Sequence, residues 1–210
     1  MVMSSIYSKS SDNYYPLLPN HLTIQYYYAK LGHSYAHLMS KERLERIAEL
    51  KWKRELKERT DDFLAKATQV INVDDLEIMD FEESLELMET SYGWPGYISD
   101  PYIQIPKDEI GLVTRIIEKL NSLVKADEIL VYFSGANIGL IRLSKSIPHH
   151  HWEGLMNIGG DISIFHPHDP YFISIELTSL PTAAHRPDKV WIYEVKFSKE
   201  DIRKQLTETR

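Results

Sequence analysis

The spacing of apolar residues along the first two thirds of the chain predicts two helices. Between Ser40 and Ile71, apolar or small residues recur at a spacing of about 3.6 positions, at Leu44, Ala48, Trp52, Leu56, Phe63, Ala67 and Ile71. A second stripe of this kind follows the acidic turn at Lys107–Glu109 and contains Ile110, Val113, Ile117, Leu120 and Val124. The first pattern predicts a long helix, and the second predicts a shorter amphipathic helix.

From Glu128 onward the period changes to two, which is typical of strands. The expected strands are Glu128–Phe133, Ile138–Ser144, Asp161–Phe165, Tyr171–Thr178 and Lys189–Phe197. Short turn sequences between them favour a meander, in which each strand pairs with the next one along the chain. The stretch after Val73 predicts a strand followed by a short helix. The proline-containing stretch 94–106 and the sequence PHHHW at 148–152 are typical of loops.

This order of elements predicts an α+β fold. We expect N-terminal helices and one central amphipathic helix to pack on a mostly antiparallel meander sheet of about five strands, with a closing C-terminal helix that begins after Ser198. Residues 1–20 are expected to be an N-terminal arm, residues 21–72 a helical segment, and residues 73–210 the α+β domain. The helical segment and the α+β domain are expected to form one compact unit.

Composition excludes several classes of protein. The chain has no cysteine, so it has no disulfide framework, no thiolate nucleophile and no cysteine-ligated metal centre. Its first residues lack the pattern of a secretory signal, and no window approaches the ~20 apolar residues of a membrane span. These features predict a cytoplasmic protein that does not bind a membrane.

The net charge of −7 comes from one segment of the chain. Residues 67–106 contain nine acidic residues and no Lys or Arg, and several aromatic rings lie close by. Such a composition predicts a surface that binds a basic protein partner, since rings supply contact area and carboxylates steer a cationic partner. The candidate partner-binding residues are Asp74, Asp75, Glu77, Asp80, Glu82, Glu83, Glu86, Tyr92, Trp94, Tyr97 and Tyr102.

The first functional hypothesis is therefore a cytoplasmic interaction module, such as an inhibitor, an immunity-type protein or an accessory subunit of a larger complex. This hypothesis requires no cofactor and does not favour direct binding of nucleic acid. The simpler interpretation is that the acidic residues only solvate a short helix while the rings fix a long loop to the domain.

Histidines in two loops suggest an alternative, a divalent-metal site. In a meander, the loop that holds His149 and His151 lies at the same end of the sheet as His185, whereas His166 and His168 lie at the opposite end. The candidate ligands are therefore His149, His151 and His185. Polar turns also use histidine, proline and aspartate, so these residues can have a purely structural role.

The sequence Tyr193-Glu194-Val195-Lys196 carries Glu-x-Lys on a strand that runs into the closing helix. It resembles half of the motif of the PD-(D/E)xK nuclease superfamily. The resemblance implies that Glu194 and an Asp on the neighbouring strand hold Mg²⁺ and that Lys196 steadies the attacking water. Asp169 has the wrong side-chain parity for this role, and Glu176 has the right parity but is expected nearer the far end of the strand pair. The alternative function is thus a metal-dependent hydrolase or nuclease.

Overall fold

The computed structural model describes residues 41–72, 76–94, 99–123, 127–144, 147–167, 169–181 and 189–198, together with Lys204. The chain forms two compact units, Met1–Arg54 and Glu55–Arg210, whose boundary falls inside helix α3 (Lys41–Ala67). The predicted N-terminal arm lies outside the described residues. So does the predicted closing helix, except for Lys204, which is helical.

Helix α3 confirms the long helix that the apolar spacing predicts. Its exposed surface is stabilised by pairs one turn apart, Glu49 with Lys53 and Asp62 with Lys66, each at 2.6 Å. In the second unit, the apolar positions at the end of α3 and just after it belong to the core: Phe63, Ala67 and Ile71 are buried.

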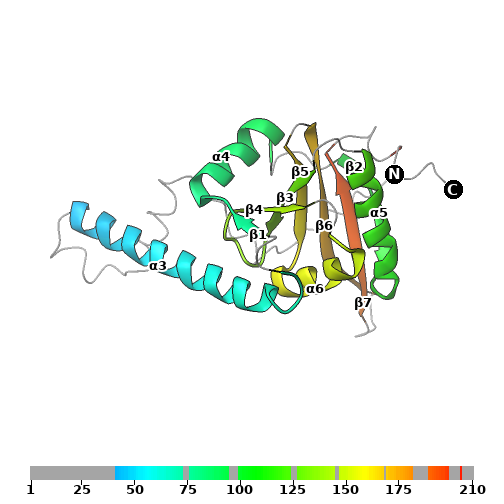
Figure 1. Ribbon diagram of the computed structural model, residues 1–210, viewed down its shortest axis with the longest axis horizontal. Coiled ribbons are helices and arrows are strands. Elements are labelled where there is room, and N and C mark those ends of the chain that lie inside the picture. The colour runs from blue at the N-terminus through cyan, green and yellow to red at the C-terminus, as the bar shows by residue number, and fades with distance from the viewer. Residues whose placement is uncertain are drawn as a thin grey trace, which may run out of the picture. The chain divides into compact units, whose positions relative to one another are not determined.

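The described residues of the second unit form a seven-stranded sheet in the order β1-β4-β3-β5-β6-β7-β2, with antiparallel neighbours throughout (Figure 1). The strands are β1 (Leu76–Ile78), β2 (Ser99–Pro106), β3 (Glu128–Phe133), β4 (Leu140–Ser144), β5 (Ile162–His166), β6 (Asp169–Pro181) and β7 (Lys189–Phe197). This confirms an α+β fold on an antiparallel sheet. The expected number of strands was too small, since the sheet has seven.

Two segments that the sequence predicts as loops belong to regular elements. Among the described residues, strand β2 lies at an edge of the sheet and pairs only with β7, so its prolines at 101 and 106 remove no hydrogen bond from a central ladder. The histidine-rich stretch begins helix α6 (His149–Gly159), which Pro148 precedes. The signal for this helix was the spacing of Trp152, Leu155 and Met156, all of which are buried.

The meander expectation is wrong between β4 and β5. Strand β5 pairs with β3 and not with β4, because α6 carries the chain from β4 across to the other side of β3. Strands β4 and β5 are both antiparallel to β3 and are therefore parallel to each other. Consequently β5, β6 and β7 each run in the direction opposite to the one that a meander gives.

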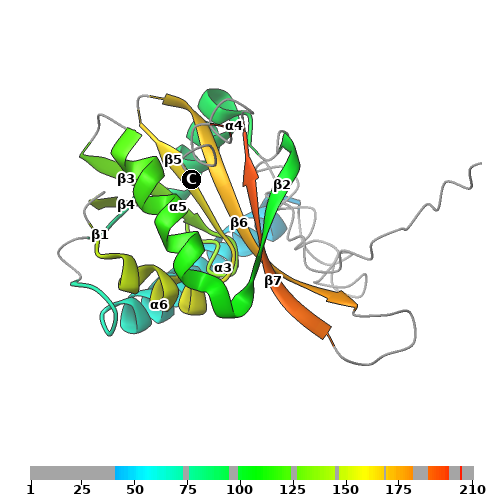
Figure 2. The same cartoon turned by 90° about the vertical axis from the view of Figure 1, so that its right-hand side faces the viewer.

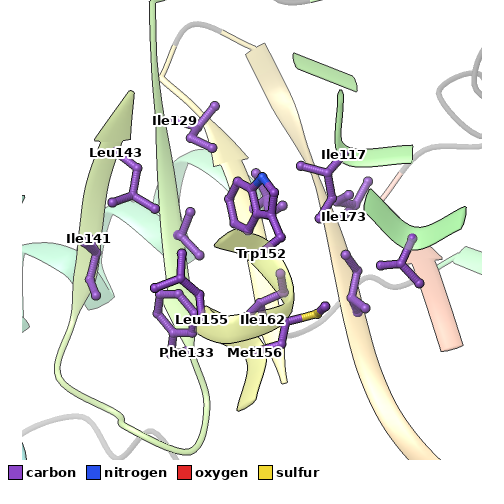
Figure 3. Close-up of a cluster of buried hydrophobic side chains, with 14 of the residues drawn as sticks. Ile117, Ile129, Phe133, Ile141, Leu143, Trp152, Leu155, Met156, Ile162 and Ile173 are labelled. Atoms are coloured by element: carbon purple, nitrogen blue, oxygen red, sulfur yellow. The ribbon is translucent and has the colours of Figure 1, made fainter. Parts of the chain in front are cut away.

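One face of the sheet is covered by α6 and by α5 (Ile110–Leu123), which follows a 3-10 turn, η2 (Lys107–Glu109) (Figure 2). The predicted amphipathic helix is thus confirmed. Between the helices and the sheet lies an apolar core, in which the fully buried Trp152 lies among Ile117, Ile129 and Ile173 (Figure 3). A Cβ at Gly159 would lie 2.2 Å from the ring of Phe133, so the end of α6 approaches β3 this closely only with glycine.

The opposite face of the sheet contains both apolar and polar residues. The alternation along the strands turns Tyr132, Phe165 and Phe172 to this face, where all three are buried. The same alternation brings Glu176 of β6 and Glu194 and Lys196 of β7 to this face. The charged side chains of Glu176, Glu194 and Lys196 therefore lie on the face away from the core under α5 and α6.

Candidate functional site

The acid-rich segment forms helix α4 (Phe81–Tyr92), and both of its ends have specific capping contacts. The side chain of Asp80 accepts hydrogen bonds from the backbone N–H groups of Glu82 and Glu83, at 2.9 and 3.2 Å. Gly93 ends the helix with a φ of 65°, a conformation that favours glycine. The sequence therefore specifies where this helix begins and ends.

A buried serine fixes α4 to the sheet. The hydroxyl of Ser84 donates to the carbonyl of Asp80 at 2.6 Å and accepts from the backbone N–H of Leu140, at the start of β4, at 2.8 Å. Gly139 lies against this contact, and a Cβ there would be 3.0 Å from the Ser84 oxygen. Sequence reasoning missed Ser84, because a serine within a helix is usually exposed and gives no sign of a long-range partner.

Two of the predicted partner-binding rings fix the C-terminal end of α4. The hydroxyl of Tyr92 donates to the carbonyl of His166 at 2.5 Å, and its ring lies 4.9 Å from that of Phe165. The ring of Trp94 lies 5.1 Å from that of Tyr132 in an edge-on arrangement. Both side chains are half-buried, so much of their area already packs against the sheet.

The predicted acidic residues divide into two groups. Glu77 forms an ion pair with Arg142 at 2.8 Å, and Asp80 caps α4, so these two carboxylates serve the fold. The others on α4 are exposed and form no ion pair within the part of the chain that the structure describes. The helix itself has no basic residue. The exposed set is Glu82, Glu83, Glu86 and Glu89.

Of the remaining predicted residues, the structure describes only Tyr102, which does not join this surface. Tyr102 is 40% exposed but lies on β2, at the far edge of the sheet order from β4, to which α4 is fixed. Asp74, Asp75 and Tyr97 lie outside the described residues. The acidic surface in the described part of the chain is therefore the outer face of α4, defined by Glu82, Glu83, Glu86 and Glu89.

A second group of charged residues joins β6 and β7. Glu176 lies directly opposite Glu194 in the register, and not toward the far end of the strand pair as the sequence suggested. The Nζ atom of Lys196 is 2.5 Å from Glu176 Oε2 and 3.8 Å from Glu194 Oε2. Pairing of β6 with β7 ends at Ile173 and Phe197, so Asp169 lies beyond it. Three of the four proposed catalytic residues thus meet, whereas Asp169 lies in the part of β6 that pairs with β5 and has no partner in β7.

Burial raises the free-energy cost of keeping these three side chains charged. The side chain of Glu194 is only 6% exposed, and those of Lys196 and Glu176 are 17% and 25% exposed. Two carboxylates on adjacent strands repel each other, and the ammonium of Lys196 between them offsets this repulsion. The hydroxyls of Ser163 and Ser174, 3.0 Å apart and buried on the same face, continue the polar strip onto β5.

Asp161, which the sequence analysis did not single out as a candidate site residue, lies at the edge of this cluster. Its Oδ1 atom accepts a hydrogen bond from the backbone N–H of Leu177 at 2.9 Å. Burial raises the pKa of Asp161, as does the nearby Glu176, whereas the Leu177 hydrogen bond and Lys196 act in the opposite direction. The one sign of it in the sequence was a polar residue after Gly159-Gly160, directly before an apolar strand.

The geometry of the Glu176–Glu194–Lys196 cluster suits an ion-pair network better than a metal centre. Carboxylate oxygens are ligands for Mg²⁺, and a metal site needs several of them around one point. No group of three or more His, Asp or Glu residues suitable for a metal ion occurs among the described residues. The ammonium of Lys196 already lies between the two carboxylates.

The predicted histidine site is only partly described. His150 and His151 lie in the first turn of α6 with ring centroids 4.1 Å apart, and partial burial together with His150 lowers the pKa of His151. The side chain of His149 and the whole of His185 lie outside the described residues. Because β4 and β5 are parallel, His166 lies at the end of the sheet from which the chain enters α6, and not at the opposite end as a meander requires.

Comparisons with models of protein families, with curated proteins and with solved structures found no match to this chain. Among the described residues, no helix has the length and the apolar character needed to cross a membrane.

Proposed function

We propose that this chain is a protein-interaction module that binds a basic protein through the outer face of α4. The supporting observation is a helix with four exposed carboxylates, no basic side chain and no ion pair to these four within the described residues. An inhibitor, an immunity-type protein or an accessory subunit would each use such a surface. The proposed surface is smaller than the sequence suggested, since the rings of Tyr92 and Trp94 pack against the sheet.

The attachment of α4 supports this function. The helix is capped at both ends, and Ser84 and Tyr92 bond it to the sheet at two separate points. Carboxylates on a fixed helix bind a partner at a smaller entropic cost than carboxylates on a mobile loop. Because the described residues leave these charges unneutralised, they also accelerate the approach of a cationic partner.

Charge reversal at Glu86 and Glu89 tests the proposal. These two positions lie away from the first turn of α4, where carboxylates also stabilise the helix dipole, so Glu86→Lys with Glu89→Lys affects the fold least. Partners are first captured from the native host and identified by mass spectrometry. Binding of the basic candidates to purified protein is then measured by calorimetry at low and high salt.

We expect the double variant to weaken binding by roughly tenfold or more, and added salt to weaken binding of the unmodified protein. The matched control is Glu109→Lys with Glu153→Lys, which changes the net charge equally at exposed positions on η2 and α6. If the two double variants bind with the same affinity, the loss reflects overall charge, and the α4 surface is not the site.

A further inference from the structure

Strand β6 has an outer edge that β5 covers only in part. Strand β5 begins at Ile162, which lies opposite Ile175, whereas β6 continues to Pro181. Beyond Ile175, β6 pairs only with β7 among the described residues, and the two strands leave the sheet as a ribbon (Figure 2). The backbone groups of this part of β6 that face away from β7 therefore have no strand beside them in the described part of the chain.

The hydrogen bonds show which residues of β6 face this outer edge. The N–H of Leu177 donates to the Asp161 carboxylate at 2.9 Å, on the side of β5. Phe172 instead bonds to Ser198, which directly follows β7: its carbonyl accepts from the Ser198 N–H at 3.0 Å, and its N–H donates to the Ser198 hydroxyl at 2.8 Å. Because backbone groups alternate between the two sides of a strand, every second residue faces the outer edge. Past the last pair with β5 these residues are Leu177, Ser179 and Pro181.

Two of these three positions have no N–H available to a further strand. Pro181 has no N–H group, and the N–H of Leu177 is already bonded to Asp161. On this edge of β6, Ser179 is left as the one outer donor among the described residues. Proline, a charged side chain directed at the edge and a short length are the means by which natural sheets protect an open edge.

The backbone before β5 places Asp161 at this edge. Gly160 has a φ of 76°, a conformation that favours glycine, where the chain turns from the end of α6 toward β5. The carbonyl of Asp161 accepts from the N–H of Ser134 at 2.9 Å, so its backbone is bound on the side of β3. Its side chain reaches β6 on the other side. There the carboxylate takes the place of the carbonyl that a longer β5 would supply.

We propose that Asp161 blocks the outer edge of β6 against pairing with a second copy of this chain. Without the carboxylate, Leu177 and Ser179 both present an N–H and a carbonyl, and this short edge is self-complementary. When two copies pair antiparallel about a two-fold axis at Thr178, Leu177 of each copy lies opposite Ser179 of the other. Both residues face the partner, so each such pair exchanges both of its backbone hydrogen bonds. The Asp161 carboxylate occupies the place that this second strand would take.

Self-association of Asp161→Ala, measured by sedimentation velocity over a range of protein concentrations, tests this inference. The substitution returns the Leu177 donor in each copy, so the variant should associate more tightly than the unmodified protein by about tenfold or more. Asp161→Asn keeps an acceptor oxygen for Leu177 and should behave as the unmodified protein does. The control Asp61→Ala, at an exposed position on α3, changes the net charge equally and should not increase association.

A second substitution separates strand pairing from nonspecific association. Ser179→Pro, added to Asp161→Ala, removes the remaining outer N–H without removing a hydrogen bond to β7, so association should return to the level of the unmodified protein. Association that persists in this double variant, or Asp161→Ala that associates no more than the unmodified protein, would show that Asp161 does not block this edge.

Hydrogen exchange in the unmodified protein, followed by NMR, tests the same edge if Asp161→Ala fails to fold. After correction for intrinsic rates, the Leu177 amide should exchange roughly tenfold or more slowly than the Ser179 amide, because Asp161 accepts only from Leu177. Equal protection of the two amides would mean that another strand or segment already covers this edge, and the proposal would be wrong.

Discussion

The second unit contains two groups of carboxylates with opposite environments. On α4, Glu82, Glu83, Glu86 and Glu89 are exposed and have no cation beside them in the described structure. On the sheet, Glu176 and Glu194 are largely buried and share Lys196. Water stabilises the first group, while the second depends on a protein cation because burial removes most of the water.

This difference shows that the number of acidic residues in a segment is a poor guide to what those residues do. The exposed group costs the fold little and adds nothing to it, so its concentration on one helix is an argument for binding. The buried group contributes to stability only as long as its cation remains, which is an argument for a structural role. Mutation should therefore cost much more stability in the buried group than in the exposed group.

The largest effect is expected from removal of the shared cation. Lys196→Met leaves Glu194 buried beside Glu176 with no cation between them, and should lower the free energy of unfolding by about 3 kcal/mol. Urea denaturation measures this change. The control is Lys66→Met, which breaks an exposed pair with Asp62 and should cost less than about 0.5 kcal/mol. Equal losses in the two variants would mean that Lys196 stabilises the buried carboxylates no more than Lys66 stabilises the exposed Asp62.

A smaller effect is expected at the start of α4. Asp80→Ala removes the acceptor for the N–H groups of Glu82 and Glu83, and should lower the free energy of unfolding by about 1 kcal/mol. Asp80→Asn retains a capping oxygen and should change the free energy of unfolding by only about a few tenths of a kcal/mol. Urea denaturation of both variants checks the pair. A similar loss in both would mean that the charge of Asp80 matters and the cap does not.

The smallest effect on stability is expected at the exposed carboxylates. Glu86→Gln with Glu89→Gln should change the free energy of unfolding by less than about 0.5 kcal/mol, because neither side chain forms an ion pair in the described structure. Thermal unfolding at low salt would reveal a larger change. A loss of stability near that of Lys196→Met would show that Glu86 and Glu89 support the fold. Their exposure would then be no argument for a role in binding.

Much of the fold followed from the periodicity of the chain. The strands from Glu128 onward and helices α3 and α5 were predicted within a few residues, because one face of each is buried and its apolar spacing is regular. Helix α6 was missed since three histidines occupy its first turn and conceal the stripe that begins at Trp152. Strand β2 was missed because prolines interrupt its alternation.

The candidate sites were harder to predict. Glu82, Glu83 and Glu86 are close in sequence, so the exposed surface of α4 was visible before the structure. Glu176 lies opposite Glu194 because of the register of β6 against β7. The alternation of side chains limits this register to every second position but does not select one of them. Ser84 and Asp161 act through partners that are distant along the chain. No local pattern marks Ser84, and only the position after Gly159-Gly160 marks Asp161.

The pairing of β3 with both β4 and β5 has a consequence for synthesis of the chain on the ribosome. The hairpin of β3 and β4 can close early, but the second edge of β3 gains its partner only when Ile162 and the residues after it have emerged. Until then a strand of apolar residues offers open hydrogen-bonding groups to any neighbouring chain. A product that terminates within α6 should therefore aggregate, whereas one that extends past His166 can cover this edge.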